Sequence, residues 1–110
     1  MTGSRKIVSG SEDGVVILWK LGKVDEVART ALHSGSIVDL AIHPSSGHVF
    51  AISLGHAGSP SILFILKPDL SATVWIAELP SAGFAIAVNG QRIVIAHQDG
   101  TLTLWQWTAE

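Results

Sequence analysis

The sequence has no cysteine, only one methionine and four prolines, and few charged residues, 15% of the total. Without cysteine, the chain can form no disulfide, no thiolate metal site and no cysteine nucleophile. Its seven Lys and Arg residues form no cluster and the formal net charge is −2. A basic footprint for a nucleic-acid backbone is therefore absent from this segment.

Long hydrophobic runs are also lacking. Apolar residues make up 47% of the chain, but they fall in runs far short of the ~20 residues that a membrane helix needs. The first residues lead straight into a strand-like run, which predicts no signal peptide. A chain of 110 residues with this apolar content is too hydrophobic for disorder and is about one domain. The absence of cysteine is compatible with a reducing, intracellular compartment.

Short β-branched runs bounded by turn residues dominate the sequence, and no segment keeps a helical period. Asp-Gly at 13–14 and 99–100 and Asn-Gly at 89–90 are typical of tight hairpin turns. The pattern predicts an all-β fold with ten strands, near residues 5–10, 15–21, 27–32, 36–42, 48–53, 61–67, 72–78, 84–88, 91–97 and 101–107.

One strand pattern occurs twice. A β-branched run leads to Asp13-Gly14 and then to Trp19, and a second run leads to Asp99-Gly100 and Trp105. The offset is 86 throughout, or two periods of 43. This period resembles that of WD40 repeats, in which each ~40–45 residues form one four-stranded propeller blade.

The resemblance implies a partial WD40 β-propeller of about two and a half blades. Naming blade strands a to d outward from the channel, we assign strands b–d of a first blade to 5–32, a second blade to 33–79, and strands a–c of a third to 81–107. Exposed sheet faces and edges would then need further blades or a partner chain to cover them. The chain would then be part of a larger propeller, a truncated product or an oligomer. The terminal half-blades both contain strands b and c, so they cannot merge into one blade.

WD40 blades often carry a hydrogen-bonded set of His, Ser or Thr, Asp and Trp, and the resemblance implies structural positions of this kind here. The matching residues are Ser9, Asp13 and Trp19 in the first blade, His33 and Ser53 in the second, and Asp99 and Trp105 in the third. Ala57 and Phe64 stand where the second blade would have Asp and Trp, and Ile95 replaces the Ser of the third. No blade has the whole set.

Catalytic and metal-binding interpretations have weaker support. His43 and His48 flank a Pro-Ser-Ser-Gly turn rather than one helix face, so we expect no metal site. No glycine precedes a Lys-Ser/Thr pair, and no Gly-x-Ser-x-Gly elbow surrounds a serine. We expect no catalytic residue and no cofactor. Asp39, the one charge in an apolar inner strand, is expected to face the channel, whereas Trp75 and Trp107 are expected to pack.

A propeller would contact partners through the loops that join strands b to c and d to a. The loop positions expected to form this partner-binding face are Ser11, Glu12, Ser34, Gly35, His56, His97 and Gln98. They are polar and carry little net charge, which favours a protein or ribonucleoprotein partner over naked nucleic acid. Direct contact with a membrane is not expected.

Residues 33–55, which include Asp39-Leu40 and His43-Pro44, resemble one subfamily more closely than generic WD40 repeats. It is the p21-activated-kinase-interacting and maintenance-of-killer group of ribosome-biogenesis proteins. The resemblance covers residues 5–55 well and 56–105 loosely. It implies a nucleolar scaffold for large-subunit (pre-60S) assembly; outside the subfamily, a cytoplasmic location would be expected. The alternatives are a regulator of a p21-activated kinase, a generic protein-complex scaffold, and an enzyme using Asp13 or His33, for which no acid–base pair has supporting spacing.

Overall fold

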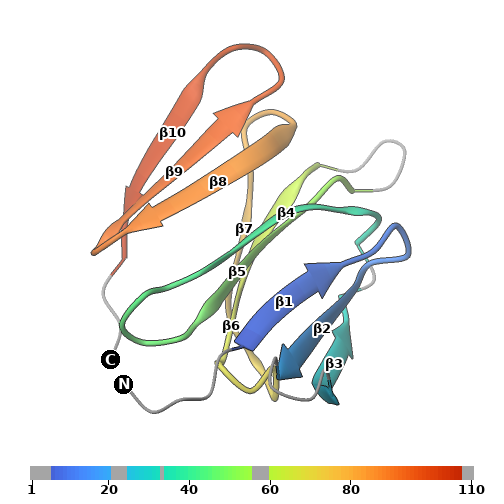
Figure 1. The fold of residues 1–110 in the computed structure, drawn as a ribbon. Coiled ribbons are helices and arrows are strands. Elements are labelled where there is room, and N and C mark those ends of the chain that lie inside the picture. Colours follow the sequence, from blue (N-terminus) through green and yellow to red (C-terminus); the bar gives the residue numbers. More distant parts are fainter. Residues whose placement is uncertain (1–5, 21–24, 33, 56–59, 108–110) are drawn as a thin grey trace.

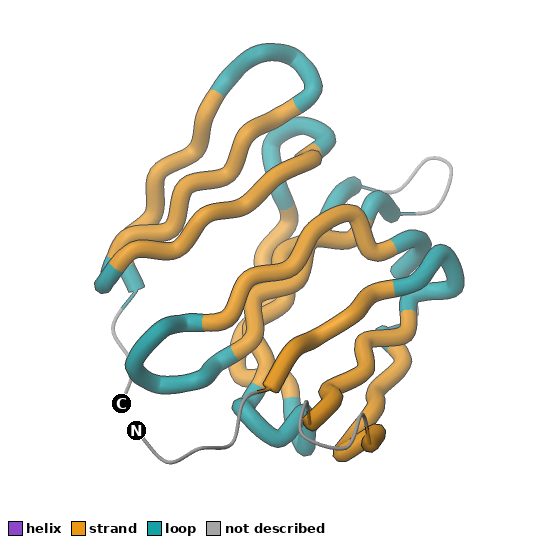
Figure 2. The backbone as a smooth tube through the Cα atoms, viewed as in Figure 1, coloured by secondary structure: helices purple, strands orange, loops and turns teal. Residues whose placement is uncertain are grey.

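The computed structural model describes residues 6–20, 25–32, 34–55 and 60–107, which form strands, turns and loops without a helix. Figures 1 and 2 show the strands gathered into three sheets that fan out side by side. The ten strands are β1 (Lys6–Gly10), β2 (Val15–Lys20), β3 (Asp25–Ala31), β4 (Ile37–Ile42), β5 (Val49–Ser53), β6 (Ile62–Leu66), β7 (Thr73–Glu78), β8 (Gly83–Asn89), β9 (Arg92–His97) and β10 (Leu102–Gln106).

Each sheet is an antiparallel meander of consecutive strands. The first sheet is β1-β2-β3, the second is β4-β5-β6-β7, and the third is β8-β9-β10. The all-β prediction is confirmed, and all ten predicted strands are present with ends shifted by one or two residues. This accuracy follows from the turn residues, because Gly and Asp mark the points where an apolar run must reverse direction.

The second sheet lies in the middle, and its strands β5 and β6 are buried on both faces. One face packs on the first sheet through a cluster of Val16, Leu18, Val49, Ala51, Phe64, Leu66 and Leu70. The other face packs on the third sheet through Phe50, Ile52, Leu63, Ile65, Leu79, Ile93 and Ile95. Adjacent residues of β5 therefore serve opposite clusters, which explains why all five residues of this strand are buried.

Strand β4 is the inner strand against which the other two sheets converge. It contacts β1 on one side and β8 on the other. At Gly10 the first two sheets come so close that an added Cβ would lie 2.4 Å from Cγ2 of Ile37. The backbone amide of Ile37 also donates a hydrogen bond to the carbonyl of Ser11, at 2.9 Å. Only glycine allows this approach of β1 to β4.

Candidate interaction surface

The turns that follow β1 and β9 have the same geometry. In the first, Ser11 N donates to Val15 O at 3.1 Å and Gly14 N to Ser11 O at 3.2 Å. In the other, the equivalent bonds join His97 to Thr101 and Gly100 to His97, both at 3.0 Å. Gly14 and Gly100 have φ of 85° and 87°, a conformation that favours glycine. Both turns lie at the same end of the fan of sheets (Figure 1).

The first sheet contains one pair of the expected hydrogen-bonded set. Trp19 Nε1 donates to Ser9 Oγ at 2.9 Å. Asp13 does not join this pair, because its carboxylate is exposed and accepts a hydrogen bond from the Ser11 hydroxyl. That bond is the largest cause holding the pKa of Asp13 below its ordinary value. The set is therefore divided between a Trp–Ser contact on the sheet and an Asp–Ser contact in the turn.

In the second sheet, the buried hydrogen-bonded pair consists of two serines. Ser53 is fully buried, and its Oγ lies 2.8 Å from Oγ of Ser34 and 3.4 Å from the carbonyl of Ile62, to which it donates. Phe64 lies directly opposite Ala51, just as Trp19 lies opposite Ile7. The register thus supports Phe64 as the tryptophan equivalent. His33 and Ala57 lie outside the described residues.

The third sheet has a polar pair of its own, built around a buried histidine. His97 is 1% exposed; its Nδ1–H donates to the Ser81 carbonyl at 3.0 Å, and its Nε2 accepts from Oγ1 of Thr103 at 2.5 Å. Asp99 accepts from the amide and hydroxyl of Thr101 in the turn, at 3.0 and 2.6 Å. The Thr101 side chain is the largest cause of the lowered pKa of Asp99. Sequence reasoning missed the link from His97 to Thr103, although both flank the Asp-Gly turn.

Trp105 has no serine beside it, because Ile95 occupies that position. Its ring packs edge-on against Trp75 of β7, with centroids 5.5 Å apart and an interplanar angle of 62°. Trp107 packs edge-on against Phe50 at 5.2 Å. The aromatic residues at the end of the chain therefore join the third sheet to the second.

The expected partner-binding face is smaller than the sequence suggested. Glu12 and Gln98 are exposed, and Ser11 and Gly35 are partly exposed. The prediction was wrong for Ser34 and His97 as accessible positions, because both are buried in the hydrogen-bonded pairs just described. His56 lies outside the described residues. The accessible part consists of the two Asp-Gly turns and the loop before β4.

Asp39 joins β4 to β8. Its Oδ2 accepts a hydrogen bond from the backbone amide of Ile86 at 2.8 Å, and its Oδ1 accepts from the amide of Leu40 at 2.9 Å. A register shift between Ile37 and Asp39 accompanies this arrangement. The carboxylate thus connects two sheets, a specific contact that its place in an apolar strand did not reveal.

His43, which directly follows β4, forms a second connection between these sheets. Its Nε2–H donates to the carbonyl of Gly90 at 2.5 Å. Its Nδ1 accepts from the amides of Ser45 and Ser46, at 3.3 and 3.2 Å. Because both ring nitrogens have partners within the chain, this arrangement gives His43 a structural role and leaves neither nitrogen free for a metal ion.

An open groove of about 680 Å³ lies between the first two sheets. Its lining residues include Lys6, Leu18, Ile42, His43, Pro44 and Pro68. It contains no paired carboxylates. Its Ser45 hydroxyl lies 3.2 Å from Nδ1 of His43, but that ring nitrogen also accepts from two backbone amides and Nε2 is bound to the Gly90 carbonyl, so the contact is part of a structural network. Among the described residues, no group of three or more His, Asp or Glu could hold a metal ion. Nor do they include a helix with the length and apolar character that a membrane crossing needs.

Comparison with solved structures identifies the architecture. The chain matches U3-55K with a TM-score of 0.78 at 16% identity, covering 92% of this chain and 30% of that one. It matches the Cps50 (Swd1) β-propeller domain of Myceliophteria thermophila with a TM-score of 0.76 at 15% identity, covering 94% and 31%. The fold is part of a WD40 β-propeller.

The computationally designed Ika4 protein is also similar, with a TM-score of 0.75 and 21% identity over 94% of this chain and 61% of the other. The chain therefore spans between 30% and 61% of the lengths of these three proteins. No protein-family model matches the sequence. At such identities the likeness defines the fold alone, and the division of the chain into blades stays a prediction.

Proposed function

We propose that this chain is a non-enzymatic scaffold that presents its Asp-Gly turns to partner proteins. The observation that carries this proposal is the pair of equivalent turns at one end of the sheets, each fixed by internal hydrogen bonds and each with an exposed polar side chain, Glu12 or Gln98. Rigid loops lose little conformational entropy on binding, which favours affinity. The polar side chains of the sheets are engaged in structural pairs, which supports a binding rather than a catalytic role.

The partner class we propose is the pre-60S ribosomal particle, with a nucleolar location. The support is the resemblance of residues 33–55 to the p21-activated-kinase-interacting and maintenance-of-killer group. Assembly into multiprotein complexes has a further precedent in this fold, since a chain from the Mitotic Checkpoint Complex matches with a TM-score of 0.76 at 16% identity. On this proposal, the chain binds particle proteins through its loops and catalyses no reaction.

Affinity purification of the endogenous protein tests this proposal. We expect large-subunit precursor RNA and ribosomal proteins to accompany it in a species far above the 11.6 kDa of one chain. Recovery of a p21-activated kinase without precursor RNA would instead identify the kinase regulator. A complex with neither would overturn the assembly role.

Charge-changing variants test the turns separately. Glu12→Lys and Gln98→Lys should each reduce recovery of the partners severalfold, because they alter exposed positions at one end of the molecule. Asp25→Lys is the matched control, since Asp25 is exposed at the start of β3 and far from these turns (Figure 1). Equal recovery with all three variants would mean that partners bind elsewhere, whatever their identity.

A further inference from the structure

The same repeat positions are buried in the first sheet and exposed in the third. Val16 and Leu18 of β2 are 0% and 2% exposed because they pack on the second sheet. Their equivalents at the offset of 86 are Leu102 and Leu104 of β10, which are 69% and 62% exposed. The third sheet thus presents an apolar face of the kind that the first sheet buries.

This exposed face continues across the third sheet. Leu104 lies opposite Val94, which lies opposite Ala87. Directly opposed residues point to the same side of a sheet, so these three side chains form one row. Leu102 and Ala96 form a second row beside it. We call this surface the leading face; its other side, with Ile93 and Ile95, packs on the second sheet.

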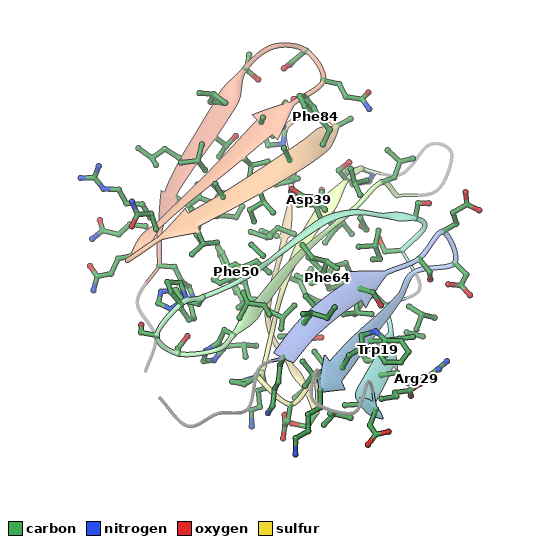
Figure 3. The ribbon with its side chains drawn as sticks, viewed as in Figure 1. Trp19, Arg29, Asp39, Phe50, Phe64 and Phe84 are labelled. Carbon is green, nitrogen blue, oxygen red and sulfur yellow. The ribbon has the colours of Figure 1, made fainter. Side chains whose placement is uncertain are left out.

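The first sheet exposes the complementary side. Trp19 and Ile7, opposite one another on β2 and β1, lie on the side away from the second sheet, and Ile7 is 45% exposed. Their equivalents in the third sheet are Trp105 and Ile93, which pack on the second sheet. We call this surface the trailing face. Figure 3 shows Trp19 and Arg29 on this outer side of the first sheet.

We propose that a second copy of this chain covers these faces, with the leading face of each copy packed on the trailing face of the other. Both contacts between sheets within one chain join a leading to a trailing side, so the contact between copies would continue an interface that already exists. The terminal sheets need not merge into one blade, because each is a separate layer that stacks face to face.

The number of sheets favours two copies. Two chains of three sheets give a ring of six, within the four to eight blades of known propellers, whereas three chains would give nine. Head-to-tail contacts produce a closed ring when the rotation per subunit allows it. Polar groups on the trailing face are already paired, since Trp19 bonds Ser9 and Arg29 forms an ion pair with Glu26. Stacking would therefore leave these groups with their partners.

Sedimentation equilibrium of the purified chain, with a matched set of variants, tests this assembly. The wild-type chain should have twice the 11.6 kDa mass of one chain. Leu104→Glu on the leading face and Ile7→Glu on the trailing face should each weaken association at least about tenfold, because each places a carboxylate in an apolar contact. Leu54→Glu is the control, since Leu54 is 44% exposed but lies in the loop after β5. Circular dichroism would establish that each variant remains folded.

Mixing the two interface variants distinguishes the packing of a leading face on a trailing face from the packing of two leading faces on each other. A Leu104→Glu chain keeps an unaltered trailing face, and an Ile7→Glu chain keeps an unaltered leading face. In the mixture these two faces can pack on each other, so mixed dimers should form at concentrations where neither variant associates alone. A wild-type monomer at all concentrations would overturn the proposal. So would a dimer disrupted by Leu104→Glu but not by Ile7→Glu, since that pattern requires two leading faces to meet.

Discussion

Replacing Asp39 by alanine tests whether the bridge between β4 and β8 stabilises the fold. The substitution removes both acceptors, leaving the amides of Ile86 and Leu40 without the carboxylate oxygens now at 2.8 and 2.9 Å. A hydrogen bond to a charged group contributes about 1.5–3 kcal/mol, and the side chain is partly buried. Because the Asp39 side chain is only partly buried, we expect a loss near the middle of that range, about 2 kcal/mol in the free energy of unfolding.

Urea denaturation at neutral pH measures this loss, and Asp39→Asn and Asp25→Ala provide the comparison. The amide keeps one acceptor oxygen and should cost about half as much, while Asp25→Ala at an exposed position should stay within about 0.5 kcal/mol of wild type. Hydrogen exchange adds a local measure, because the Ile86 amide should lose protection in Asp39→Ala. An Asp39→Ala chain as stable as Asp25→Ala, with Ile86 still protected, would refute the bridge.

Two further predictions concern repeat positions and acid stability. Leu18 is buried, so Leu18→Ala should lower the free energy of unfolding by about 2–4 kcal/mol. Leu104 is exposed, so Leu104→Ala, measured on dilute monomer, should change this free energy by about 0.5 kcal/mol or less. Similar losses for the two variants would mean that Leu104 is buried in the monomer. Hydrogen bonds from Thr101 lower the pKa of Asp99 below 3.8, so their stabilisation is present above that pH and is lost as the pH falls through the folded pKa. Asp99→Asn should therefore reduce the loss of stability on acidification, measured by denaturation at successive pH values; an unchanged pH dependence would contradict this.

The strands and their repeat positions could be predicted because local signals specify them. The Asp-Gly turns fix where two hairpins reverse, and the repeat places Trp19 and Trp105 at equivalent points. Their cross-strand partners, Ile7 and Ile93, are separated by the same offset of 86. Even the divergent second repeat keeps this register, since Phe64 lies opposite Ala51.

The polar contacts could not be predicted, because they depend on how sheets and turns meet in space. In the sequence, His97 looks like a loop residue beside an Asp-Gly turn, yet its side chain is 1% exposed and forms hydrogen bonds with Ser81 and Thr103. The carboxylate of Asp39 reaches Ile86, which is 47 residues away in the sequence, and β4 changes register beside it. Sequence periodicity specifies the face of a strand but carries no information on such distant partners.

The side-chain hydrogen bonds of Asp39 and His43 imply that the second sheet is held more firmly to the third sheet than to the first. Asp39 within β4 and His43 directly after it connect the second sheet to the third. Between the first and second sheets, the described residues contain one backbone hydrogen bond, from Ile37 to Ser11, beside the apolar contacts. The first sheet should consequently detach before the other two separate, making β1–β3 a subunit of lower local stability that opens and recloses while β4–β10 stay folded.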